Sequence, residues 1–192
     1  MQRIALFASG SGSNAGQITQ YFADNPDVQV TLIATNNPSA GVIERARRLH
    51  VPVLLFDRTS FNDGQITQLL VSQRIDLIVL AGFLWLVPAD LVRAFPRRII
   101  NIHPALLPKF GGRGMYGHYV HEAVVAAGET ESGITIHYVD EHYDEGQIIF
   151  QARCPVLPAD TPADVARRVQ ILEHENYPRV VAEVLQRLTN DG

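Results

Sequence analysis

Two side chains at the end of an apolar run have the chemistry to move a proton beside a developing oxyanion. Asn101 and His103 follow Arg98-Ile-Ile, and they supply a carboxamide and an imidazole. Alternate side chains of an extended strand share a face, so we expect both groups to point to one side. Pro104 should end that strand, because proline has no N–H to donate. Open α/β sheets place ligand sites at such strand ends.

An acidic turn over residues 140–146 could supply a carboxylate to this imidazole. A carboxylate facing His103 would stabilise the imidazolium and raise the His103 pKa. The alternative is an exposed hairpin. Spacing alone does not choose among the four candidates, which are Asp140, Glu141, Asp144 and Glu145.

The segment Ser9–Asn14 is a glycine-rich loop between an expected strand and an expected helix. Backbone N–H groups and a helix N-terminus at such a turn can hold a phosphate. The loop has neither G-x-G-x-x-G spacing nor the lysine of a P-loop, so a tight turn without a ligand is the alternative.

The positions of three further histidines can be explained without a functional role. His137 alternates with isoleucines on an expected strand, so it could line a site or be a hydrogen-bonded structural residue. His118 and His121 begin an expected helix, where a solvated helix start accounts for both. We expect no metal site, because no H-E-x-x-H or paired-cysteine motif is present. The apolar segment Phe83–Val87 is read as core, with a slot for a flat ligand as the alternative.

The composition of the chain argues against a nucleic-acid-binding protein and a membrane protein. The net charge of −4 and the lack of a Lys/Arg run argue against a nucleic-acid-binding surface. The lone cysteine, Cys154, fits a reducing compartment and is expected to be a core thiol at a strand end. No apolar stretch reaches the roughly 18–20 residues that span a bilayer. No secretory signal is recognised at the N-terminus, so we expect a cytoplasmic protein.

Short apolar runs alternate with amphipathic segments, which is typical of βαβ units around a parallel sheet. Strands are expected over 3–8, 28–35, 51–56, 76–81, 98–103, 133–139 and 147–154, and helices over 14–22, 40–49, 61–73, 88–94, 118–127 and about 160–187. Residues 109–117 should form a mobile glycine-rich loop. The prediction is one α/β domain over 1–192: an open, mostly parallel twisted sheet with helices on both faces and an antiparallel C-terminal addition.

Five segments together resemble the phosphoribosylglycinamide formyltransferases, folate-dependent enzymes of purine biosynthesis. They are Leu6–Asn14, Val79–Phe83, Asn101–Lys109, Gly133–Gly146 and Val169–Pro178, so the resemblance covers nearly the whole chain. It implies a Rossmann-like formyltransferase fold, 10-formyltetrahydrofolate as co-substrate and no metal. It also implies that the N-terminal part, about residues 1–100, binds the ribonucleotide phosphate. The C-terminal part, about residues 101–192, would carry the catalytic residues and part of the folate pocket.

The resemblance assigns residues to three roles. The catalytic set would be Asn101, His103 and Asp144. The ribonucleotide would be bound by Gly12, Ser13, Asn14, Gln170 and Glu173, and the folate by Leu84, Trp85, Leu86, Val87, Asn101 and Asp140, with Arg58 as a loosely aligned candidate for the folate tail. Ala105 stands where many relatives have Ser, and residues 110–117 look longer than the common loop.

The implied reaction is direct formyl transfer from 10-formyltetrahydrofolate to the amine of glycinamide ribonucleotide. Asn101 and a charged His103 would stabilise the tetrahedral oxyanion, and Asp144 would orient His103. One rival is another folate formyltransferase, such as the one acting on methionyl-tRNA, which needs a further domain and a basic surface. The other is a non-catalytic nucleotide-binding regulator. We expect small-molecule substrates as partners, no nucleic acid or membrane, and a monomer or homodimer.

Overall fold

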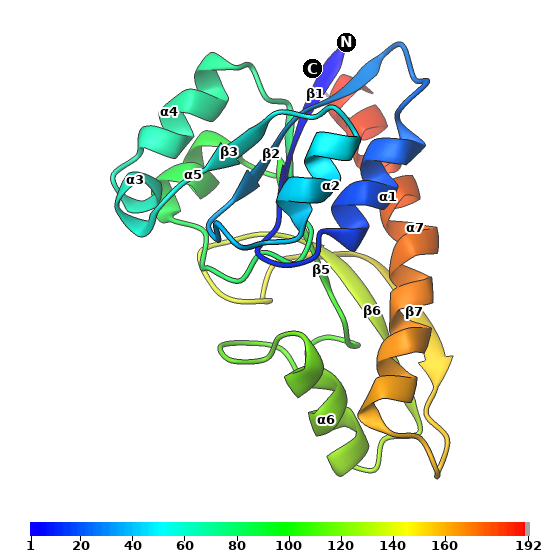
Figure 1. Ribbon diagram of the computed structural model, residues 1–192. Coiled ribbons are helices and arrows are strands. Elements are labelled where there is room, and N and C mark those ends of the chain that lie inside the picture. Colours follow the sequence, from blue (N-terminus) through cyan, green and yellow to red (C-terminus); the bar gives the residue numbers. More distant parts are fainter. Residues whose placement is uncertain (191–192) are drawn as a thin grey trace.

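A seven-stranded twisted sheet with helices on both faces forms the centre of the computed structural model, which describes residues 1–190 (Figure 1). The strand order is β3-β2-β1-β4-β5-β6-β7. The parallel strands are β1 (Gln2–Phe7), β2 (Val28–Thr35), β3 (Val53–Leu55), β4 (Leu77–Leu80) and β5 (Ile99–His103). Strand β6 (Glu131–Tyr138) pairs antiparallel with β5, and β7 (Ile148–Pro155) pairs antiparallel with β6. The predicted mostly parallel sheet with an antiparallel C-terminal addition is confirmed.

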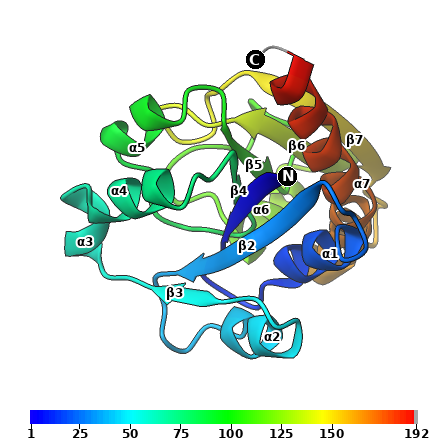
Figure 2. The same ribbon diagram turned by 90° about the horizontal axis from the view of Figure 1, so that it is seen from above.

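Two hydrophobic cores lie on opposite faces of this sheet, because successive side chains of a strand point to opposite sides. In β1, Ile4 and Leu6 belong to one core, and Ala5 and Phe7 belong to the other. The first core is closed by helices α1 (Ser13–Tyr21), α2 (Val42–Arg48) and α7 (Pro162–Asn190). The second is closed by α3 (Arg58–Asn62), α4 (Gln65–Ser72) and α5 (Ala89–Ala94), and Figure 2 shows the sheet between the two groups.

One predicted helix is two helices in the structure. The segment expected as a single helix over 61–73 begins earlier, because Asp57 forms a capping box with Ser60 in which Oδ1 accepts from the Ser60 amide at 2.8 Å. It is interrupted at Gly64, whose φ of 85° lies in the left-handed region that ends a helix. The remaining elements agree with the predicted ones to within a few residues at their ends.

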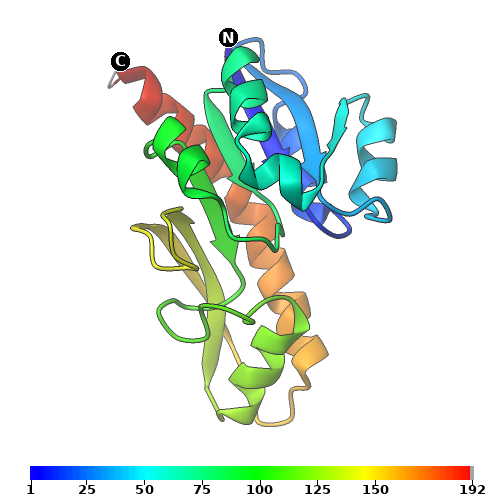
Figure 3. The same cartoon turned by 90° about the vertical axis from the view of Figure 1, so that its left-hand side faces the viewer.

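Helix α7 runs the length of the molecule and joins the parallel part of the sheet to its antiparallel part (Figure 3). It packs on β6, on α6 (His118–Ala126) and on α1. Although α7 has 29 residues, no helix within residues 1–190 is apolar enough over a sufficient length to cross a membrane. Cys154 is buried near the end of β7, as predicted, and burial raises the pKa of its thiol.

Tyr177 connects α7 to the sheet through hydrogen bonds to β4 and β5. Its ring is fully buried, and its hydroxyl donates to the Leu80 carbonyl oxygen at 2.8 Å, with the Ile100 carbonyl oxygen at 3.4 Å. Both carbonyls belong to strands that lead into the cavity described below. Tyr177 therefore links the position of α7 to the position of β4 and β5.

The substitution Tyr177→Phe should lower the free energy of unfolding by about 1–2 kcal/mol, because it removes a buried hydrogen bond. Urea unfolding followed by circular dichroism measures this loss. Tyr21→Phe is the matched control, since Tyr21 is 54% exposed, and it should change stability by less than about 0.5 kcal/mol. Equal stability of wild type and Tyr177→Phe would contradict the proposed link.

Candidate active site

A cavity of about 740 Å³ opens at the carboxyl ends of β1, β4 and β5. Between β1 and β4 the strand order reverses, since β2 and β3 extend to one side and β5 to the other. Open α/β sheets bind ligands at such a switch point, because the loops after the two strands diverge and leave a crevice. The cavity walls come from both the first and the second half of the chain.

The glycine-rich loop between β1 and α1 forms one wall. Gly12 has φ 68°, and a Cβ atom there would lie 2.2 Å from Cγ2 of Val42, so only glycine fits. Helix α1 starts directly after Gly12 without a side-chain cap, and this leaves its first N–H groups available to a ligand. Ser13 and Asn14 line the same wall.

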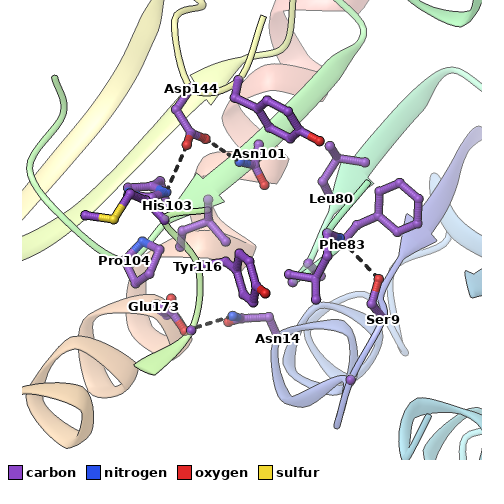
Figure 4. Close-up of a pocket in the computed structure, with 18 of the residues that line it drawn as sticks. Ser9, Asn14, Leu80, Phe83, Asn101, His103, Pro104, Tyr116, Asp144 and Glu173 are labelled. Atoms are coloured by element: carbon purple, nitrogen blue, oxygen red, sulfur yellow. Dashed lines mark hydrogen bonds and ion pairs between the residues drawn. The ribbon is translucent and has the colours of Figure 1, made fainter. Parts of the chain in front are cut away.

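Asn101, His103 and Asp144 converge on the cavity, as Figure 4 shows. His103 Nδ1 lies 3.4 Å from Asp144 Oδ2, and Asn101 Nδ2 lies 3.5 Å from Asp144 Oδ1. The Gly112 amide donates to Asp144 Oδ2 at 3.0 Å. The Asp144 side chain is 11% exposed, whereas those of Asp140 and Glu141 are 45% and 54% exposed. Asp144 is thus the carboxylate that turns inward, a choice that spacing had left open.

His137 holds the carboxamide of Asn101 in place. The two residues are directly paired across β5 and β6, and Asn101 Nδ2 lies 3.2 Å from His137 Nε2. His137 Nδ1 is 2.9 Å from the Tyr138 carbonyl oxygen, so Nδ1 carries a hydrogen, and Nε2 also lies 3.5 Å from Asp144 Oδ1. His137 is buried and also lines the cavity. The two roles considered for it from sequence are both present.

Asp144 acts on the His103 pKa in the expected direction, but the pKa is lowered overall. Burial lowers the pKa of the imidazole, and this outweighs the attraction of Asp144 and the hydrogen bond from Nε2 to the Phe110 carbonyl oxygen at 2.7 Å. Burial would raise the pKa of Asp144, but contacts with His137, His103 and Gly112 overcome it and hold that pKa below its usual range. The pair therefore consists of an ionised carboxylate and an imidazole whose protonated form is disfavoured by burial.

A second polar pair lies across the cavity, between α1 and α7. Asn14 Nδ2 donates to Glu173 Oε2 at 2.9 Å, and Gln170 lines the cavity one helical turn before Glu173. Burial raises the pKa of Glu173 to about 6, against the opposing effect of the Asn14 hydrogen bond. Tyr116, from the predicted glycine-rich loop, lies between this pair and the Asn101–His103 strand end (Figure 4).

The apolar segment after β4 is only partly core. Phe83 and Val87 are buried, whereas Leu84 and Leu86 are 45% and 41% exposed, and all of Leu84, Trp85, Leu86 and Val87 line the cavity. Ser9 positions this segment, because its hydroxyl accepts from the Leu84 amide at 3.1 Å. Sequence reasoning had missed this role, since a loop serine carries no signal of its distant partner.

Two of the residues assigned to the folate by resemblance are not in the cavity wall. The guanidinium of Arg58 stacks on Trp85, 4.2 Å from the ring centroid, and Arg58 itself does not line the cavity. Asp140 instead accepts from the His142 amide at 2.8 Å within the turn. The wall at this turn comes from Val139, His142, Tyr143 and Asp144. The folate roles of Arg58 and Asp140 stay predictions.

A solvated helix start is the wrong explanation for His121. His118 is exposed, whereas His121 is 7% exposed and lines the cavity. His121 lies on the side of the helix that faces the cavity. In the part of the chain that the structure describes, no three His, Cys, Asp or Glu side chains are grouped so that they could hold a metal ion.

Comparison with known proteins agrees with this architecture. The formyl transferase family model matches residues 2–181. Phosphoribosylglycinamide formyltransferase of Bacillus subtilis is 38% identical, over 100% of this chain and 98% of that protein. The chloroplastic enzyme of Arabidopsis thaliana is 41% identical over 96% of this chain, which spans 66% of the plant protein. The crystal structure of phosphoribosylglycinamide formyltransferase from Streptococcus pneumoniae superposes with a TM-score of 0.85 at 36% identity, covering 96% of this chain and 99% of that one. The chain therefore belongs to the formyl transferase family.

Proposed function

We propose that this protein transfers the formyl group of 10-formyltetrahydrofolate to the amine of glycinamide ribonucleotide. The observation that carries the proposal is the convergence of Asn101, His103 and Asp144 in one cavity. The same cavity is lined by the Asn14–Glu173 pair and by the apolar segment Leu84–Val87. A site of this kind can hold a phosphorylated sugar and a flat heterocycle side by side with their reacting groups at the strand end. Two relatives that match over nearly the whole chain are named phosphoribosylglycinamide formyltransferases, which supports formyl transfer to this ribonucleotide.

The ribonucleotide would be bound by the wall between α1 and α7. Its phosphate would accept from N–H groups at Gly12, Ser13 and Asn14, where the helix N-terminus adds partial positive charge. Glu173 would accept hydrogen bonds from the ribose hydroxyls when it is ionised, and Gln170 would contact the same substrate. This arrangement would leave the amine facing His103.

The folate would lie against the opposite wall. Leu84 and Leu86 expose apolar surface to the cavity, and Trp85 and Val87 complete that wall. The backbone near Asp144 would offer hydrogen bonds to the edge of the pterin, with Asn101 near the formyl group. Holding both substrates in this way removes much of the entropy cost of a bimolecular reaction.

Transfer would proceed without an enzyme nucleophile. The substrate amine attacks the formyl carbon and gives a tetrahedral oxyanion; the bond from that carbon to the folate nitrogen then breaks, while the amine loses a proton and the folate nitrogen gains one. Asn101 would donate to the oxyanion, with its carboxamide oriented by His137. The growing negative charge would raise the pKa of His103 and favour its protonated form, with Asp144 beside it.

The rival functions have less support. The methionyl-tRNA enzyme needs a basic surface, whereas this chain has a net charge of −4. A non-catalytic nucleotide-binding regulator would have no need for Asn101, His103 and Asp144 together. The cytoplasmic location, the monomer or homodimer, and the division of roles between residues 1–100 and 101–192 stay predictions.

The direct test is an assay of purified protein with both substrates, following the loss of the formyl group from 10-formyltetrahydrofolate. We expect turnover that requires glycinamide ribonucleotide. A folded protein that binds the ribonucleotide but never deformylates the folate would favour the regulator instead.

The substitution Asn101→Ala should lower kcat by about 10²-fold or more, because one donor to the oxyanion is lost. The KM values should change far less, since this hydrogen bond strengthens only in the transition state. Steady-state kinetics measure both effects. Asn62→Ala is the control, because Asn62 is exposed and outside the cavity. An unchanged kcat for Asn101→Ala would rule out the oxyanion role.

His103→Ala should abolish formyl transfer while ribonucleotide binding persists, because His103 lies at the reacting centre and the phosphate wall is formed by other residues. Single-turnover kinetics and calorimetric titration with glycinamide ribonucleotide separate the two effects. His50→Ala, at an exposed position, should behave as wild type. Normal turnover by His103→Ala would overturn the mechanism.

Ribonucleotide affinity should fall as the pH drops through about 6, because Glu173 has a raised pKa of about 6 and becomes neutral below it. The substrate phosphate also titrates near pH 6, so the comparison must be made with Glu173→Gln. That variant should bind more weakly at pH 7.5 and show a smaller pH dependence than wild type. Parallel pH profiles for the two proteins would exclude Glu173 as the titrating group.

A further inference from the structure

His121 is a buried histidine that the proposed mechanism does not use. It is the fourth residue of α6, the helix that follows the glycine-rich loop ending at Gly117, and it is 7% exposed. It lines the same cavity as His103 and Asn14. Its neighbour His118, one turn earlier on the same helix, is exposed and outside the cavity wall.

The imidazole of His121 has an unsatisfied nitrogen. Within residues 1–190 only four buried side-chain polar atoms lack a hydrogen-bond partner, and His121 Nδ1 is one of them. Another is Asn14 Oδ1, which belongs to the wall that we assign to the ribonucleotide. Buried polar atoms are rarely left unpaired, because desolvation without a partner costs free energy. Both residues line the cavity, and a small adjustment of either side chain would let a bound ligand supply the missing partner.

The position of α6 places His121 near the ribonucleotide half of the cavity. Helix α6 packs against α7, which carries Gln170 and Glu173. The ring is also close enough to His103 for that residue to disfavour its protonation. Since the substrate amine must reach the formyl carbon beside His103, we expect the adjoining glycinamide arm to pass near His121.

The imidazole of His121 is suited to a neutral partner. Burial lowers its pKa, and His103 lowers it further. A neutral imidazole offers one donor and one acceptor, which matches an amide better than a phosphate dianion.

We propose that His121 binds the glycinamide arm of the ribonucleotide by hydrogen bonding to its amide, and so positions the amine for attack. This inference rests on the proposed function and adds a specificity residue to it. The amide distinguishes this substrate from other phosphorylated sugars, so a residue that reads it would contribute to the choice of substrate.

Substitution of His121 by Leu tests the hydrogen bond, because Leu fills a similar space without a polar atom. We expect the KM for glycinamide ribonucleotide to rise about 10-fold, with the KM for 10-formyltetrahydrofolate within about twofold of wild type. The melting temperature should stay the same or rise, since an unsatisfied buried nitrogen is removed. His121→Asn, which retains a donor and an acceptor, should recover part of the affinity.

The matched control is His118→Leu, which changes the same residue type on the same helix outside the cavity and should leave both KM values within about twofold. A wild-type ribonucleotide KM in His121→Leu would overturn the inference, as would a loss of thermal stability in both His121 variants without a change in that KM. A wild-type protein that fails to formylate the ribonucleotide would refute the proposed function itself. An active wild type with an unaffected His121→Leu would refute this inference alone.

Discussion

The antiparallel pairing of β5 with β6 is the constraint on which the catalytic end of the cavity depends. It sets Asn101 opposite His137, and His103 opposite Thr135. Because the register of an antiparallel pair is fixed by the hydrophobic pattern, a slip of one residue would move both polar side chains to the other face. Strand β6 also leads directly into the turn that carries Asp144. One strand pairing thus positions the imidazole, the carboxamide and the carboxylate.

A conflict between burial and charge governs the electrostatics of this site. Burial lowers the pKa of His103 and raises that of Glu173, so each ionised form is disfavoured. Asp144 escapes this outcome because His137, His103 and the Gly112 amide together hold it ionised. Screening inside a buried site is weak. A negative charge that develops during the reaction therefore acts strongly on an ionisable side chain whose charged form was disfavoured beforehand. The cavity is therefore prepared for an oxyanion more than for a permanently charged imidazole.

The sheet topology explains why two unlike ligands can meet at one point. The loop after β1 and the segment after β4 diverge at the switch point, and one forms a phosphate wall while the other forms an apolar wall. Helix α7 closes the phosphate side with Gln170 and Glu173, and Tyr177 anchors the same helix to β4 and β5. Residues more than one hundred positions apart in the chain, such as Asn14 and Glu173, are thereby brought into direct contact.

The sequence by itself determined the alternation of strands and helices, the strand face shared by Asn101 and His103, and the glycine-rich turn at Gly12, because periodicity and backbone preference are local properties. Its resemblance to a family indicated Asp144 and Glu173. The burial of His121 and the lowered pKa of His103 were decided only by the tertiary structure. Burial depends on which elements pack together, and a pKa in a cavity depends on burial as much as on the nearest charge, so neither could be read from spacing along the chain.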